Sequence, residues 1–329
     1  MRIAVDAMGG DLAPDEVIKG ASLAAQELGV EVLLVGHQQR IEPVLADLPR
    51  SGIEILHASD VIEMQDLAIR AARKKKDASI VVAARSVKEG RADALVSAGS
   101  TGAAMVATLL SWGRIKGIER PAIGTVMPTP EGRCVLLDAG AHVNAKPNHL
   151  VQYARMGSVY AERVLGMQKP RVGLLNIGEE ETKGCELVLE VFPRLKALPQ
   201  INFVGNIEGR DILSGRVDVI ICDGFVGNVV LKFAEGMART IFLLLRDALS
   251  ADLKSRVGGL LITDALQRVK ARLDYSEYGG APLLGVDGIC VISHGSSDAP
   301  AIFNAIRVAK EAVEQDVTSH IRAFATGRT

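Results

Sequence analysis

Six glycine-rich segments carry the residues whose types suit chemistry, and each follows a run of residues typical of a β-strand. They read DAMGGD (6–11), SAGSTGA (97–103), DAGAHVN (138–144), NIGEEETKG (176–184), CDGFVGN (222–228) and SHGSSDA (293–299). Most of them lead into a predicted helix. A helix N-terminus offers free N–H groups and the positive end of the helix dipole, and glycine lets an anion approach the backbone closely. The pattern therefore predicts a site for a small oxyanion such as phosphate.

The turn at 97–103 is the clearest candidate for holding that oxyanion. Ser100 and Thr101 add hydroxyl donors to the backbone N–H groups at the predicted start of a helix. No lysine closes the turn as in a nucleoside-triphosphate P-loop, so it suits a single phosphate or an oxygen that becomes negative during a reaction. The other residues predicted to bind phosphate or substrate come from the same set of loops: Asp6, Gly9, Gly10, Ser97, Gly99, Gly102, Asn176, Glu180, Asp223, Gly224 and His294.

Other classes of site fit the sequence less well. The histidines and cysteines show no zinc-like spacing, and we predict no metal and no cofactor. Asp6 and Asp11 are placed so that they would share a magnesium ion, but Asp11 more simply caps the helix that Pro14 begins. A serine-hydrolase elbow needs G-x-S-x-G and a dinucleotide fold needs G-x-G-x-x-G near the first strand; neither spacing is present.

Composition narrows the function further. The 329 residues carry a formal net charge of −1, and only 4% are aromatic, so we expect no nucleic-acid partner. The longest apolar runs fall short of the about 20 residues that a membrane span needs, and the N-terminal residues do not resemble a secretory signal. We expect a cytoplasmic protein.

The loops must be positioned by alternating strands and helices. Strands are predicted at Arg2–Asp6, Glu31–Gly36, Ile53–Leu56, Ala92–Ser97, Ala122–Met127, Arg133–Asp138, Arg171–Asn176, Asn202–Val204, Val217–Cys222 and Ile289–Ile292. Their nearly continuous apolar content indicates a mainly parallel sheet covered by helices on both faces, a three-layer α/β/α sandwich forming one domain over residues 1–329. Because the carboxyl ends of parallel strands form the ligand crevice, we expect the six loops to converge on one edge.

Residues 229–274 break this alternation. They are predicted to form two consecutive helices that meet near SRVGGLLIT (255–263), a helical hairpin inserted in the domain with an apolar tip. The basic residues near the tip are Lys254, Arg256, Arg268, Lys270 and Arg272. The hairpin is interpreted as a dimer arm, as a peripheral membrane contact, or as both.

Longer blocks of the chain resemble bacterial phosphate acyltransferases. These blocks are DAMGGD (6–11), SAGSTGA (97–103), LLNIGEEETKG (174–184), DVIICDGFVGNVVLKFAEG (218–236), YGGAPLLG (278–285) and SHGSS (293–297), and they cover nearly the whole chain in order. The sequence departs from the family pattern at Ser100, where asparagine is expected, and at His142 and Asn144.

The resemblance implies a fold similar to isocitrate dehydrogenase and phosphotransacetylase, and a homodimer. It implies that acyl carrier protein supplies an acyl thioester, that inorganic phosphate accepts the acyl group, and that a membrane glycerol-3-phosphate acyltransferase uses the product for phospholipid synthesis. The enzyme is then expected to work at the inner face of the membrane.

A mechanism without an acyl-enzyme is consistent with these residues, because phosphate is already an oxyanion near neutral pH. We predict catalytic roles for two residues. Lys183 would offset developing negative charge, or else pair with Glu179 or Glu180. Asn228 would donate to the acyl carbonyl, or else cap the first hairpin helix. The runs FLLL and GGLLI in the hairpin are candidates for an acyl-chain groove, and its basic residues for docking an acidic carrier protein.

Three alternatives remain open on the sequence alone. A phosphotransacetylase would use coenzyme A and a short acyl group. An NAD-dependent hydroxyacid dehydrogenase would share a similar fold, and a non-catalytic scaffold would bind phosphate or acyl groups without turnover.

Overall fold

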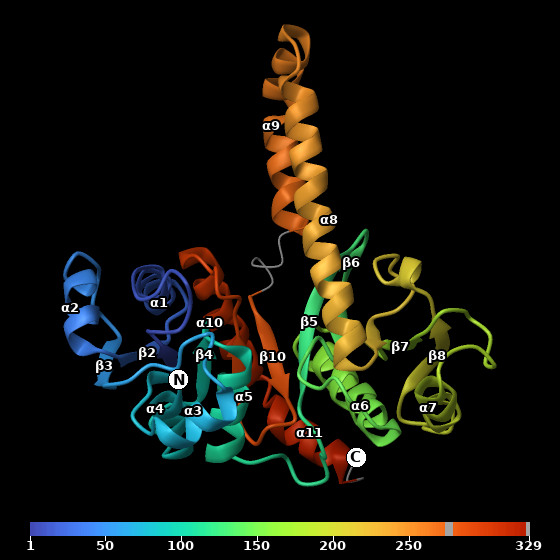
Figure 1. Cartoon of the computed structure of the whole chain (residues 1–329), viewed down its shortest axis with the longest axis horizontal. Helices are drawn as coiled ribbons and strands as arrows, with labels where there is room; N and C mark the ends of the chain where they lie inside the picture. Colours follow the sequence, from blue (N-terminus) through green and yellow to red (C-terminus); the bar gives the residue numbers. More distant parts are fainter. Residues whose placement is uncertain (274–278, 327–329) are drawn as a thin grey trace.

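The computed structural model describes residues 1–273 and 279–326, with side chains described as far as residue 269 in the first segment. Its strands form one sheet in the order β3-β2-β1-β4-β11-β10-β5-β6-β9-β7-β8 (Figure 1). The strands are β1 (Arg2–Asp6), β2 (Glu31–Gly36), β3 (Ile53–His57), β4 (Ala94–Ser97), β5 (Ala122–Thr129), β6 (Gly132–Leu137), β7 (Arg171–Leu175), β8 (Asn202–Ile207), β9 (Val219–Ile221), β10 (Ala281–Leu284) and β11 (Cys290–Ile292).

All ten predicted strands are present, with ends that differ from the prediction by at most three residues. The prediction missed β10, which is only four residues long and contains Pro282. A strand this short with a proline carries little periodic signal, because proline usually marks an edge or a break.

The predicted convergence of six loops on one edge is wrong. Strands β1, β4 and β11 are mutually parallel, and so are β6, β7 and β9. Between these two groups stand β10 and β5, and the pairs β11–β10, β10–β5 and β5–β6 are all antiparallel. The two groups of strands therefore run in opposite directions, and their loops leave opposite edges of the sheet.

Helices cover both faces of the sheet, which confirms the three-layer α/β/α architecture. They are α1 (Asp15–Glu27), α2 (Gln38–Ala46), α3 (Ala68–Lys74), α4 (Ser79–Lys88), α5 (Thr101–Ser111), α6 (Pro147–Arg163), α7 (Glu186–Lys196), α8 (Gly224–Ser250), α9 (Leu253–Leu273), α10 (Ala299–Glu314) and α11 (Val317–Ala325). The core beneath α3, α4 and α5 continues to the first turns of α8 on one face. Separate cores beneath α1, α2 and α10, and beneath α6, α7 and α11, fill the other face.

The hairpin consists of α8 and α9, and it projects away from the sheet (Figure 1). Its helices do not meet at 255–263 as predicted, because α8 ends at Ser250 and α9 begins at Leu253. Gly258 and Gly259 lie inside α9, where a Cβ on Gly259 would lie 3.4 Å from the Cβ of Leu249. These two glycines therefore lie in a helix rather than in a turn, and Gly259 packs toward Leu249 of α8. No helix within the described residues is long and apolar enough to cross a membrane.

Candidate active site

The loops after β1, β4 and β11 interlock through buried polar contacts. The Asp6 carboxylate accepts a hydrogen bond from the Ser97 hydroxyl at 2.8 Å, and the same hydroxyl accepts from the Gly99 N–H at 3.1 Å. The Asp11 N–H donates to the Gly295 carbonyl at 2.7 Å. These bonds fix the backbone of all three loops with respect to one another.

Two glycines in this group are required, Gly9 by close approach and Gly10 by its backbone conformation. A Cβ on Gly9 would lie 2.6 Å from an Asp6 oxygen and 2.7 Å from the Gly99 nitrogen. Gly10 has a φ of +113°, which L side chains rarely adopt.

Asp11 makes no side-chain cap. Helix α1 begins at Asp15 with Pro14 as its N-cap, so the capping role predicted for Asp11 is wrong.

The loops after β6 and β9 form a second group around Asp138. Its carboxylate accepts hydrogen bonds of 2.8–3.1 Å from the backbone N–H groups of Ile123, Gly140, Ala141 and His142. The Gly224 N–H donates to the His142 carbonyl at 3.0 Å. One carboxylate thus holds the loop after β6 in place, and that loop in turn holds the start of α8.

Burial dominates the electrostatics of both groups. It raises the pKa of Asp6, against hydrogen bonds from the side chains of Ser79 and Ser97 that lower it. Burial also raises the pKa of Asp138, against the four backbone hydrogen bonds. The hydrogen bonds that each aspartate accepts give it a structural function in holding a loop.

Between the two groups lies a cavity of about 260 Å³ over β5 and β10, where the sheet changes direction. Helix α5 contributes Thr101 to its wall, α8 closes another side, and the loop after β11 adds Ser293 and His294. Helix α8 contributes Asn228, Leu231, Lys232 and Glu235 to the lining. Their spacing of three and four residues places them on one face of the helix.

A cation stands at the wall of this cavity. The Lys232 Nζ lies 2.9 Å from a Glu235 carboxylate oxygen and 3.5 Å from the His294 Nε2. The other ring nitrogen of His294 lies 2.8 Å from the Ser296 hydroxyl. Glu235 and His294 flank the ammonium group at the cavity wall, where its remaining N–H bonds can donate to an anion.

Two hydroxyl groups in the cavity wall are buried and lack a hydrogen-bond partner among the described residues. They belong to Thr125 on β5 and to Ser293 directly after β11. A buried hydroxyl left unpaired costs about 1–3 kcal/mol, and a polar ligand would remove this cost. Together with Lys232, these hydroxyls make the cavity suited to an oxyanion.

Three residues predicted from the sequence lie at this cavity, namely Thr101, Asn228 and His294. Asn228 is not a helix cap, because Asp223 is the N-cap of α8 and its carboxylate accepts from the N–H groups of Phe225 and Val226. The capping alternative for Asn228 is therefore wrong. Ser100 is the N-cap of α5, and its hydroxyl accepts from the Ala103 N–H at 3.4 Å.

The predicted residues of the loop after β7 lie elsewhere. Asn176 donates to the Lys183 carbonyl at 2.9 Å, and Asn206 donates to the Glu180 carbonyl at 3.0 Å. Glu179 pairs with Arg216 at 2.7 Å instead of with Lys183. Among the described residues that line the cavity, none comes from this loop.

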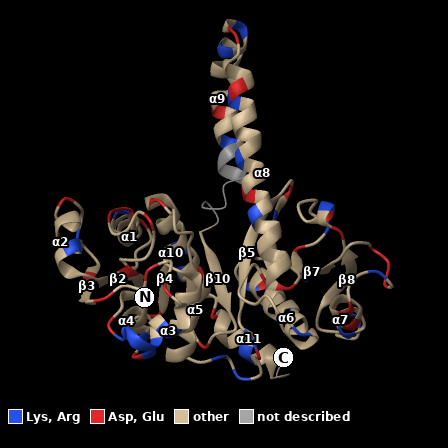
Figure 2. Ribbon diagram, viewed as in Figure 1, with Lys and Arg blue, Asp and Glu red and all other residues tan. Residues whose placement is uncertain are grey.

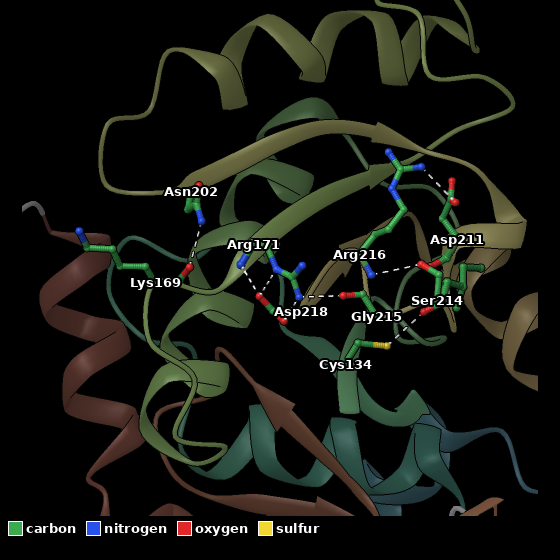
Figure 3. A network of polar contacts seen from close by, with 10 residues as sticks. Cys134, Lys169, Arg171, Asn202, Asp211, Ser214, Gly215, Arg216 and Asp218 are labelled. Carbon is green, nitrogen blue, oxygen red and sulfur yellow. Dashed lines mark hydrogen bonds and ion pairs between the residues drawn. The ribbon is translucent and has the colours of Figure 1, made fainter. Parts of the chain in front are cut away.

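The polar network next to that loop has a structural explanation. Arg171 pairs with Asp218 at 2.9 Å, and Arg216 pairs with Asp211 at 3.2 Å (Figure 3). The first ion pair joins the start of β7 to the segment that precedes β9, and the second lies within that segment. The network orders the chain around β7 and β9 and places no group in the cavity.

Sequence reasoning missed Lys232, Thr125 and Ser293. A signal for Lys232 was present, because it follows Asn228 by four residues on the same helix face. Thr125 was the one polar residue in the predicted strand AIGTVM, which reads as a tolerated hydroxyl until its lack of a partner is seen.

Comparison with known proteins decides the family. Residues 1–320 match the family described as "Fatty acid synthesis protein". A phosphate acyltransferase from Heliobacterium modesticaldum is 57% identical over 100% of this chain and 98% of its own length, and one from Desulfitobacterium hafniense is 57% identical over 98% and 96%. The chain belongs to the phosphate acyltransferase family. The resemblance seen in the sequence is confirmed, and the chain is an acyltransferase of lipid synthesis.

The fold is shared more widely than the family. A phosphotransacetylase from Streptococcus pyogenes superposes with a TM-score of 0.65 at 16% identity, covering 95% of this chain and 94% of its own. At this identity the likeness concerns the fold alone, and it confirms the phosphotransacetylase-like fold expected from the resemblance.

Proposed function

We propose that this chain transfers a fatty acyl group from the thioester of acyl carrier protein to inorganic phosphate. The product is an acyl phosphate for phospholipid synthesis. The observation that carries the proposal is the cavity whose lining combines Lys232 with two hydroxyls, on Thr125 and Ser293, that lack a partner among the described residues. The relatives' printed name, phosphate acyltransferase, supports phosphate as the acceptor.

The residues around the cavity have different roles in the reaction. Lys232 neutralises the bound phosphate, and the hydroxyls of Thr125, Ser293 and Thr101 donate hydrogen bonds to its oxygens. The amide of Asn228, which also lines the cavity, donates to the carbonyl oxygen of the thioester as negative charge develops there. Holding both reactants in one cavity supplies the proximity that direct transfer needs.

The reaction then proceeds without an acyl-enzyme. A phosphate oxygen attacks the carbonyl carbon of the thioester, and a new C–O bond forms. This addition produces a tetrahedral intermediate with negative charge on the former carbonyl oxygen. The C–S bond breaks when this intermediate collapses. The thiolate of the carrier leaves and takes up the proton that the monohydrogen phosphate brought, so atoms and charge balance.

One assay tests the function and its nearest rival. Purified protein is incubated with phosphate and one donor (palmitoyl-carrier protein, palmitoyl-CoA or acetyl-CoA), and acyl phosphate is trapped with hydroxylamine. We expect the highest kcat/KM with the carrier protein. A preference for acetyl-CoA would identify a phosphotransacetylase instead, and an acylated protein mass during turnover would overturn direct attack.

We predict that removing either unpartnered hydroxyl weakens phosphate binding without loss of stability. Thr125→Val and Ser293→Ala should each raise the KM for phosphate about tenfold, because a hydrogen bond to a charged group is worth about 1.5–3 kcal/mol. The melting temperature should stay the same or rise, since each change removes an unpaired buried hydroxyl.

Thr108 provides the matched control for these variants. Its hydroxyl is also buried, but it donates to the Ala104 carbonyl at 2.9 Å, outside the cavity. Thr108→Val should lower the melting temperature and leave the KM for phosphate unchanged. If all three variants behave alike, the hydroxyls in the cavity do not bind phosphate.

The role of the hairpin extends the proposal to assembly and location. Exposed apolar side chains recur every four residues along α8: Phe225, Val229, Phe233, Met237 and Ile241. We propose that this stripe pairs with a second copy in a homodimer, and that the exposed Leu260 and Leu261 on α9 contact the inner face of the cytoplasmic membrane. There the acyl phosphate reaches a membrane glycerol-3-phosphate acyltransferase.

The hairpin predictions separate assembly from membrane contact. Met237→Asp/Ile241→Asp should convert the dimer to a monomer in sedimentation velocity, because it places charge in an apolar interface. Leu260→Glu/Leu261→Glu should keep the dimer and lose co-sedimentation with anionic vesicles. If the wild-type chain sediments as a monomer and does not co-sediment with anionic vesicles, both the dimer contact and the membrane contact are wrong.

The acyl-chain groove predicted for the hairpin stays a prediction. A groove of about 550 Å³ lies between α8 and α9, lined by Phe242, Leu245, Leu249 and Leu260 among others. Phe242 follows Lys232 by ten residues, which is roughly 15 Å along a helix. The basic side chains predicted near the tip include Lys270 and Arg272, which lie outside the described side chains.

A further inference from the structure

The segment that leads into and through α3 packs on the loops of the cavity. A Cβ on Gly102 would lie 3.1 Å from the Cβ of Ala68, and a Cβ on Gly295 would lie 3.1 Å from the Cε of Met64. Gly102 and Gly295 are direct neighbours of Thr101 and His294, which line the cavity. We call residues 64–76 the α3 rim, because they stand beside two walls of the site.

The α3 rim is strongly basic. Arg70, Arg73, Lys74 and Lys76 are exposed, and no ion pair among the described residues engages any of them. In Figure 2, ribbon segments coloured blue for Lys and Arg gather at α3 and α4. The fifth cation, Lys75, differs from these four because it pairs with Asp66 at 2.9 Å and anchors the rim itself.

The same rim exposes large apolar side chains in the residues that precede its cations. Met64, Leu67 and Ile69 are 53%, 74% and 61% exposed. A surface that only kept the protein soluble would not need three such residues within six positions. Apolar side chains with unpaired cations around them are typical of a surface that binds an acidic protein.

The cations at the tip of the hairpin, Lys254 and Arg256, are a poorer location for a partner that must reach the cavity. Ser250 ends α8 eighteen residues beyond Lys232, which is roughly 27 Å along the helix. Arg256 lies beyond that point and donates to the Ser250 carbonyl at 3.1 Å. The α3 rim, in contrast, contacts the loops of the cavity directly.

We infer that the α3 rim docks the acyl donor, an acidic helical carrier protein whose flexible arm delivers the thioester into the cavity. The inference rests on the proposed function. The exposed cations attract the acidic surface of the carrier, and Leu67 and Ile69 meet its apolar side chains. Only the arm needs to enter the cavity, so the carrier itself stays outside.

The test compares a carrier-bound donor with a donor that lacks the protein. The charge reversal Arg70→Glu/Arg73→Glu/Lys74→Glu is assayed with decanoyl-carrier protein and with decanoyl-pantetheine. We expect the KM for the carrier donor to rise about tenfold or more, with kcat and the KM for decanoyl-pantetheine unchanged. Raising the salt concentration should raise the wild-type KM for the carrier donor only.

A matched control reverses three cations of the hairpin, Lys254→Glu/Arg256→Glu/Arg268→Glu. The inference is overturned if this control raises the KM for the carrier donor while the α3 variant does not. It is also overturned if the α3 variant raises the KM for both donors equally. The milder Arg70→Gln/Arg73→Gln/Lys74→Gln repeats the test should the charge reversal unfold. Failure of the proposed function is distinct, because the wild type would then form no acyl phosphate from either donor.

Discussion

Replacing Lys232 with methionine should lower kcat/KM about 100-fold. The expected loss is that of one strong donor to a developing or bound oxyanion, which costs about 10²–10³ in rate in other enzymes. Methionine keeps the length and apolar stem of the side chain, so α8 should keep its packing. Hydroxylamine trapping measures the rate, and the melting temperature checks the fold.

Two comparisons make the Lys232 result specific. Lys183→Ala removes a lysine that lies outside the cavity, and we expect it to keep kcat/KM near the wild-type value. Lys232→Arg keeps the positive charge but replaces the ammonium group with a planar guanidinium group. We therefore expect it to have more activity than Lys232→Met and less than the wild type. If instead Lys183→Ala abolishes turnover and Lys232→Met does not, the catalytic cation is the one predicted from the sequence.

Replacing Gly227 with alanine should destabilise the protein by about 3 kcal/mol, near the upper end of what overpacking costs. A Cβ at this position would lie 1.9 Å from the Asp138 carbonyl oxygen and 3.0 Å from the Cys222 sulfur. The first turn of α8 would have to move away from the loop after β6. Asn228 and Lys232 would move with it, so kcat/KM should fall as well.

Gly236 is the matched control for this change, because it lies in the same helix and a Cβ added there would meet no described atom within 4 Å. Gly236→Ala should raise stability by about 0.5–1 kcal/mol, since glycine is a poor residue in a helix interior. Urea unfolding measures both variants. Equal effects at the two positions would mean that contact with Asp138 does not set the position of α8.

The candidate site was partly readable from the sequence. Thr101, Asn228 and His294 were chosen from glycine-rich loops, and all three line the cavity. Lys183 was chosen by the same rule and lies elsewhere, because a glycine-rich loop after a strand reveals a turn but not the place of that strand in the sheet. Strand β7 lies beyond β9, farther from β5 and β10, and its loop does not reach the cavity. Thr125 was passed over, since a threonine in a strand looks ordinary until its surroundings are known.

The sequence by itself determined the strands and the turns between them. Runs such as RIAVD and EVLLVG are apolar enough to be buried on both faces, and the glycines that follow permit tight turns, so both features are local. Tertiary structure alone decided the direction of each strand, because direction depends on which partner a strand meets across the sheet. The reversal at β10 and β5 placed the cavity between two sets of loops, and α8 brought Lys232 to the wall of the cavity that Ser293 and Thr125 also line.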